Sequence, residues 1–301
     1  MMSITGRGIA AQFGYVGRAV QAVLSLTTRT ARPYIGFVNR RNQLLALCCL
    51  IAFAGLGVLY FHYWVVQKPF GIVLFIGEGL TASRLAPTRL YAGGADTPLA
   101  IDSLVYSASL TNQSNDFAAA DPAAAATALS TGVKVNNRAV ARGSEGKKLT
   151  SIIELAHLSG RTTGLVTDAS LTNPTAAAFY AHASSPEDRE KFATELIKDD
   201  KIDIVLGGGA QDFLPPEKGG RRNDAADLLL EMKHNGFDVV RTKAELEAIP
   251  GWRRPKLFGA FAESELAYAD EMQTRSEQPT LADMVRRAIE LLQFNRTGYL
   301  L

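Results

Sequence analysis

Acidic residues are missing from the first part of this chain. No Asp or Glu precedes Glu78, whereas six arginines lie between Met1 and Gln67. These arginines alternate with apolar residues and do not cluster with lysines, which argues against a nucleic-acid-binding surface. A basic segment without acids is typical of a membrane-topology signal.

Cysteine is also scarce. The two cysteines, Cys48 and Cys49, are neighbours in an apolar run, so they cannot form a useful disulfide, and the rest of the chain has none. The remaining composition, 47% hydrophobic and 21% charged, is that of a globular protein. A length of 301 residues allows one large domain or two ordinary ones.

One long segment without charge runs from Leu44 to Val66. It has about the ~20 residues that a helix needs to cross a bilayer, and aromatic residues gather at its C-terminal end, as in an interfacial belt. A buried core helix and a cleaved signal peptide are the alternatives, but no small-residue cleavage motif follows the run. We expect an uncleaved transmembrane anchor at residues 44–66 that contacts the lipid bilayer.

The orientation of this anchor is predicted from Arg40 and Arg41, which lie directly before it. Positively charged residues favour the cytoplasmic side. We therefore expect a basic cytoplasmic arm at residues 1–43 and a periplasmic or extracellular location for the domain that follows, at residues 70–301.

Apolar runs of strand length alternate with helical patterns in this domain. The expected strands are Gly71–Ile76, Thr163–Thr167 and Ile202–Leu206, and the expected helices are Leu149–Leu158, Thr175–His182, Asp188–Ile197 and Asp224–His234. This order predicts an α/β fold of three layers, a mostly parallel sheet covered on both faces. Ligands of such sheets bind at the C-terminal ends of the strands.

The last residues predict a helix at Thr280–Phe294 and the beginning of a strand at Tyr299–Leu301. Backbone groups of a core strand need partners. We therefore expect the domain to be truncated on its C-terminal side, with a second chain or a homodimer as ways of completing it.

Three segments together resemble the alkaline phosphatase family. Phe75–Leu80 (FIGEGL) is similar to the pattern I-G-D-G-M, and Asp121–Lys134 (DPAAAATALSTGVK) to D-S-A-A-x-A-T-A-x-x-T-G-x-K. The third segment is Thr163–Val166 followed by Thr172–His182 (TNPTAAAFYAH). The resemblance extends from Phe70 to Leu301 in the family's order. It implies an alkaline-phosphatase-like fold and hydrolysis of phosphate monoesters by a serine nucleophile, with two zinc ions and usually magnesium as cofactors.

Two positions of the implied active site are substituted. Pro122 stands where the family has its nucleophilic serine, and Pro186 stands where it has the arginine that holds the phosphate. Without the family, Asp121 and Pro122 are explained as the N-cap and first residue of a helix. Arg189, three residues after Pro186, could replace the arginine only if the segment reorients.

The implied metal ligands are altered as well. Glu78 stands at the position of the metal-bridging aspartate, and Asn173 and Thr175 match the family's Asp-x-Thr magnesium pair. A neutral oxygen at Asn173 should bind a hard cation more weakly. His182 lies where the family has a histidine near its site, although a single histidine on a helix is usually structural.

These observations predict a membrane-anchored relative of the phosphatases, inactive or impaired as a hydrolase. A non-catalytic envelope protein that binds a phosphorylated small molecule or a protein partner is one alternative. A truncated gene product without a stable fold is the other.

Overall fold

The structure is a computed structural model that describes residues 40–64, 71–143, 145–198, 200–252, 256–272 and 274–301. Most of the expected basic arm, residues 1–39, lies outside the described residues. Contacts divide the chain into two units, Met1–Val66 and Gln67–Leu301, which we describe separately.

The described part of the first unit is a single helix, α2 (Arg40–Trp64). It begins four residues before the expected anchor, and its span Arg40–Tyr60 has a mean hydropathy of 2.2. At about 1.5 Å per residue, a helix of 25 residues is longer than the ~30 Å hydrocarbon core. Side chains from Arg40 to Tyr60 are exposed. By length and composition, α2 is able to cross a membrane.

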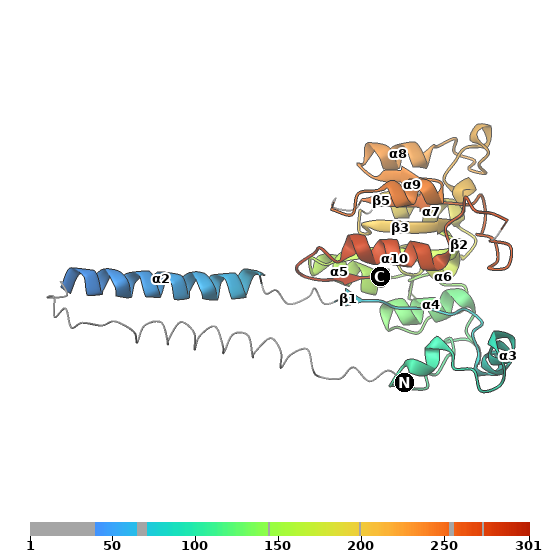
Figure 1. Ribbon diagram of the computed structural model, residues 1–301. Helices are drawn as coiled ribbons and strands as arrows, with labels where there is room; N and C mark the ends of the chain where they lie inside the picture. The colour runs from blue at the N-terminus through green and yellow to red at the C-terminus, as the bar shows by residue number, and fades with distance from the viewer. Residues whose placement is uncertain (1–39, 65–70, 144, 199, 253–255, 273) are drawn as a thin grey trace. The chain divides into compact units, whose positions relative to one another are not determined.

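The second unit is built on a six-stranded sheet in the order β1-β6-β2-β3-β5-β4, in which every pair is parallel (Figure 1). Its strands are β1 (Gly71–Ile72), β2 (Thr162–Ser170), β3 (Ile204–Gly208), β4 (Asp238–Val240), β5 (Leu257–Ala260) and β6 (Tyr299–Leu300). The predicted parallel sheet is confirmed.

Helices cover both faces of this sheet. The helices of this unit are α3 (Ala82–Ala92), which buries no residue, α4 (Pro122–Thr131), α5 (Ile152–Leu158), α6 (Pro174–Ala177), α7 (Arg189–Lys198), α8 (Leu228–His234), α9 (Lys243–Ala248) and α10 (Leu281–Leu292), with short 3₁₀ turns at Ala100–Ser103, Ala210–Asp212 and Pro216–Lys218. Alternate residues of β3 face opposite sides: Val205 belongs to the core under α4–α8, and Ile204 and Leu206 belong to the core under α9 and α10.

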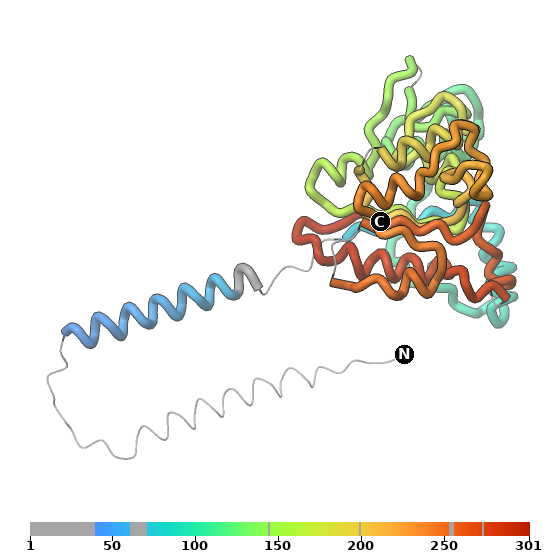
Figure 2. The backbone as a smooth tube through the Cα atoms, turned by 90° about the horizontal axis from the view of Figure 1, so that it is seen from above, coloured from blue at the N-terminus to red at the C-terminus, as the bar shows by residue number. Residues whose placement is uncertain are grey.

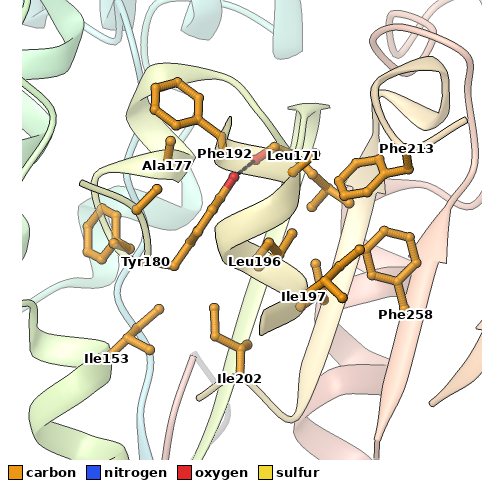
Figure 3. Packing of buried hydrophobic residues seen from close by; sticks show 14 of the residues in the cluster. Ile153, Leu171, Ala177, Tyr180, Phe192, Leu196, Ile197, Ile202, Phe213 and Phe258 are labelled. Carbon is orange, nitrogen blue, oxygen red and sulfur yellow. Dashed lines mark hydrogen bonds between the residues drawn. The ribbon is translucent and has the colours of Figure 1, made fainter. Parts of the chain in front are cut away.

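The larger core contains aromatic side chains from several elements (Figure 3). Phe213 and Phe258 pack edge to face with ring centroids 5.0 Å apart. The buried Tyr180 hydroxyl donates a hydrogen bond to Leu171 O at 2.8 Å, so its polar atom is satisfied (Figure 3). This core holds the loops that follow β2 and β3.

Two expected elements are shorter than predicted. The extended segment Gly71–Ile76 pairs in the sheet as β1, and Leu74 N donates a further hydrogen bond to Leu301 O at 2.8 Å. The expected helix Thr175–His182 is helical only as α6, after which the chain turns. The sequence analysis did not predict α3, α9, β4 or β5.

The strand β6 lies inside the sheet and not at its edge. It pairs with β1 through Tyr299 and Leu300 and with β2 through the same two residues. Figures 1 and 2 both place the C-terminal residue within the globular unit. The expected strand at Tyr299–Leu301 is therefore observed, with partners on both sides.

Candidate functional site

The N-terminus of α4 is formed as the sequence predicts. Asp121 is the N-cap and accepts a hydrogen bond from Ala124 N at 2.8 Å, and Pro122 occupies the first helical turn. The second carboxylate oxygen of Asp121 accepts from Arg138 N at 2.7 Å. Both oxygens thus serve the local backbone, and the cap occupies an amide that would otherwise face an anion.

No other hydroxyl of α4 replaces the missing serine. Thr127 and Ser130 are fully buried, at 0% and 2% exposure. Thr127 Oγ1 bonds with Ala139 O and Ala141 N, and Ser130 Oγ donates to Ala178 O at 2.6 Å. Both side chains stabilise the packing of α4 and neither lines the cavity at its N-terminus.

A cavity of about 300 Å³ brings several predicted site residues together. Its lining comprises Asp121, Pro122, Ala123, Pro174, Pro186, Glu187 and Arg189. Pro122 and Pro186, which are far apart in the sequence, therefore line the same cavity. The cavity thus contains both positions, Pro122 and Pro186, at which the resemblance implies a nucleophile and a phosphate-holding cation.

The cations around this cavity are paired with carboxylates. Arg189 is the cation of the lining, and its Nη1 lies 3.9 Å from Asp212 Oδ2. Glu187 has a pKa below its usual value because Ser185 and Arg138 donate hydrogen bonds to it, so it is ionised near neutral pH. Arg138 pairs with Glu187 at 2.6 Å, so both cations near the cavity already have carboxylate partners.

The expected metal ligands come together only in part. Thr175 Oγ1 donates a hydrogen bond to Glu78 Oε2 at 3.2 Å, which joins two positions that are 97 residues apart. Asn173 caps α6, and its side-chain oxygen accepts from Thr175 N at 2.9 Å. No group of three His, Cys, Asp or Glu suitable for a metal occurs among the described residues. These residues therefore do not fit a complete zinc or magnesium centre.

His182 is part of the packing between α5 and α7. It is only 4% exposed, its Nε2 lies 3.0 Å from Leu149 O, and its backbone N–H donates to Glu195 Oε2 at 2.8 Å. Burial raises the pKa of Glu195, but hydrogen bonds with His182 together with the charges of Lys148 and Lys191 bring it below its usual value. The histidine lines none of the cavities described here.

Sequence reasoning missed one buried polar cluster, centred on Asp212. Its side chain is 1% exposed and accepts hydrogen bonds from Ser170, Thr172 and Arg221. Arg222, also buried, donates to the Asp212 carbonyl at 3.2 Å. These residues follow β2 and β3, so the rule that polar groups gather at C-terminal strand ends could have found them. The cluster joins the two loops beside Arg189.

Comparisons with known proteins agree with this fold, a parallel sheet covered by helices. The family model for alkaline phosphatase matches residues 71–301. Alkaline phosphatase 4 of Bacillus subtilis is 32% identical over 241 residues, which cover 76% of this chain and 50% of that protein. The chain belongs to the alkaline phosphatase family.

Solved structures support the same fold. A cold-active alkaline phosphatase from Shewanella sp. has a TM-score of 0.66 and 27% identity, covering 77% of this chain and 55% of that one. A variant of TAB5 alkaline phosphatase with Mg bound in its M3 site has a TM-score of 0.65 and 24% identity, covering 78% and 64%. The chain spans about half the length of the curated relatives it matches.

Proposed function

We propose that this chain is a membrane-anchored, non-hydrolytic member of the alkaline phosphatase family. The observation that carries the proposal is Pro122 at the start of α4. Hydrolysis through a phosphorylated serine needs an attacking oxygen at this position, and proline has none. Removal of a catalytic nucleophile costs roughly 10⁴- to 10⁶-fold in rate.

Three further observations support the proposal. Pro186 lies beside Pro122 where a phosphate-holding cation would be needed, and Arg189 is directed to Asp212. Asp121 uses both carboxylate oxygens for the local backbone. The residues Glu78, Asn173 and Thr175 supply a single acid, and a neighbouring amide already occupies the oxygen of Asn173. Zinc and magnesium chemistry therefore has too few ligands in the described residues.

The membrane anchor of this proposal is α2, which has an apolar span. Arg40 and Arg41, the first two residues of α2, favour a cytoplasmic N-terminus. The phosphatase-like unit then lies in the periplasm or outside the cell. Metal-assisted hydrolysis by this family remains the alternative activity that the test must detect.

The test compares three forms of the full chain: unchanged, Pro122→Ser and Pro122→Ala. Each is incubated with an aryl phosphate, Zn²⁺ and Mg²⁺, and phosphate release is measured. We expect the unchanged chain and Pro122→Ala to match the protein-free blank, with any gain confined to Pro122→Ser. Metal-dependent turnover by both the unchanged chain and Pro122→Ala would show that the reaction does not depend on this position, and would overturn the proposal.

A further inference from the structure

The parallel sheet brings its helix-to-strand connections to one edge. Every strand pair is parallel, so all strands begin at the same edge (Figure 1). We call this surface the N-terminal edge, and its described residues are 158–161, 200–203, 235–237, 249–252, 256 and 293–298. The buried cluster of Asp212 follows β2 and β3 and therefore belongs to the opposite edge.

The two edges differ in charge. By sequence, the connections that precede β2 to β6 contain six Lys or Arg and three Asp. The connections that follow β1 to β5 contain ten Asp or Glu and five Lys or Arg. The N-terminal edge is therefore the basic end of the second unit, and the opposite edge is acidic.

Two lysines of the N-terminal edge are engaged in ion pairs. Lys201 pairs with Glu154 at 2.7 Å, and Lys256 pairs with Asp200 at 2.8 Å. The other bases of these connections are arginines, of which Arg296 is exposed. The positive charge in excess thus belongs to arginine, whose planar guanidinium suits phosphate oxygens.

Apolar side chains are exposed at the same edge. Trp252, Leu158 and Phe294 are 82%, 78% and 65% exposed. In sequence, an arginine follows each of them within three residues, in the pairs Leu158 and Arg161, Trp252 and Arg253, and Phe294 and Arg296. Single exposed apolar residues are normal, but this repeated pairing with arginine is typical of a surface that meets lipid headgroups.

Hydrogen bonds join these connections to one another. Asn295 Nδ2 donates to Gly160 O at 2.9 Å, which holds the connection after α10 beside the one after α5. Lys256 Nζ donates to Asp200 at 2.8 Å, which joins the connections before β5 and β3. The apolar and basic residues therefore belong to neighbouring segments of one edge.

We propose that the N-terminal edge lies against the membrane surface, with its apolar side chains among the lipid headgroups and its arginines at anionic phosphates. This inference rests on the membrane anchor of the proposed function. In sequence, six residues separate Trp64 at the end of α2 from Gly71 at the start of β1. A tether of this length spans at most ~25 Å, so it keeps the edge at which β1 begins close to the bilayer.

Charge selects this edge over the opposite one. Anionic headgroups attract bases near the surface and repel acids. The connection after β5 alone carries Glu263, Glu265, Asp270, Glu271 and Glu277 against the single base Arg275. An anionic bilayer therefore favours contact through the N-terminal edge.

The test follows the fluorescence of Trp252 in the full chain reconstituted in lipid vesicles. The chain has two tryptophans, so Trp64→Phe leaves Trp252 as the only one. The vesicles contain phosphatidylcholine and anionic phosphatidylglycerol, with a lipid brominated close to its headgroup as the quencher. We expect Trp252 to be quenched, and less so in phosphatidylcholine alone or at about 1 M salt, where the Debye length is ~3 Å.

A matched control places the tryptophan at the acidic edge. The variant combines Trp64→Phe, Trp252→Phe and Tyr268→Trp, since Tyr268 is 78% exposed in the connection after β5. We expect little quenching at position 268. In the Trp64→Phe background, Arg296→Gln should lower the ratio of membrane-apposed to free edge roughly fivefold, and Arg275→Gln should leave it unchanged.

Equal quenching at positions 252 and 268, or none at position 252, would overturn the proposal. Alkaline extraction of the same vesicles reports on the anchor separately. A chain that resists extraction while Trp252 stays unquenched contradicts only this inference. A chain that is extracted contradicts the anchor of the proposed function as well.

Discussion

At the scale of single residues, Asp121 and Pro122 have a local structural role at the start of α4. An aspartate N-cap followed by proline is a favourable helix start, and the structure uses both residues for this purpose. Under the proposed function, Pro122 leaves this helix end without an attacking oxygen. The proline is structurally compatible with the fold, since it occupies the first turn of α4.

The cap makes a measurable contribution to stability. We expect Asp121→Ala to lower the free energy of unfolding by about 1–2 kcal/mol, because Ala124 N and Arg138 N lose their acceptors. Asp121→Asn, which keeps one side-chain oxygen, should lose less. Urea denaturation of the three proteins measures this, and an equal loss in both variants would contradict the role of the cap.

At the scale of elements, the N-terminal end of α10 is stabilised by the contacts of the Asp283 carboxylate. Asp283 accepts hydrogen bonds from Lys243 Nζ at 2.9 Å and from Thr280, and these lower its pKa to about 2 against a burial effect that raises it. A carboxyl with a depressed pKa stabilises the folded state above its ordinary value of 3.8, and this contribution is lost as the pH falls through about 2.

We therefore expect Asp283→Asn to destabilise the protein by about 1–2 kcal/mol at pH 7. The difference from the unchanged chain should shrink between pH 4 and pH 2. Asp270→Asn, at an exposed turn, serves as the control and should show little effect. Chemical denaturation at several pH values measures this; a difference that stays constant down to pH 2 would exclude an ionic origin.

Elements with strong patterns were predictable from the sequence, and weak ones were not. The capping box and apolar spacing of α10 predict its position closely. In contrast, β4 has only three residues, and β5 contains Gly259, so neither has a recognisable period.

The candidate site was predictable to the same limited degree. Family spacing singled out Pro122 and Pro186, and the structure shows that both line one cavity. It did not predict that Arg189 is directed to Asp212 or that Asn173 is engaged with Thr175 N, since both depend on side-chain partners in three dimensions.

At the scale of the whole molecule, the sheet determines which amides are protected. The strand β3 pairs on both sides and is buried throughout, so its amides should exchange most slowly, ahead of those of β4 at the edge. Hydrogen exchange measured by mass spectrometry tests this. Absence of protected amides between residues 71 and 301 would instead indicate a product without a stable fold.

The anchor is the other property of the whole molecule. We expect Leu50→Arg, in the middle of α2, to reduce the fraction that resists alkaline extraction from membranes, because arginine at the centre of a span costs about 2.5–3.5 kcal/mol. Leu158→Arg, at a side chain 78% exposed in the second unit, controls for the added charge and should remain membrane-bound. Equal extraction of both variants would contradict a spanning role for α2.

The central claim is that no residue at the start of α4 becomes phosphorylated. It is tested most directly by intact-mass measurement of the full chain after incubation with an aryl phosphate and acid quenching. We expect the mass of the unmodified chain for the unchanged protein, with and without Zn²⁺ and Mg²⁺. A stoichiometric mass increase of one phosphoryl group, mapped to a peptide that contains residues 121–131, would contradict the account.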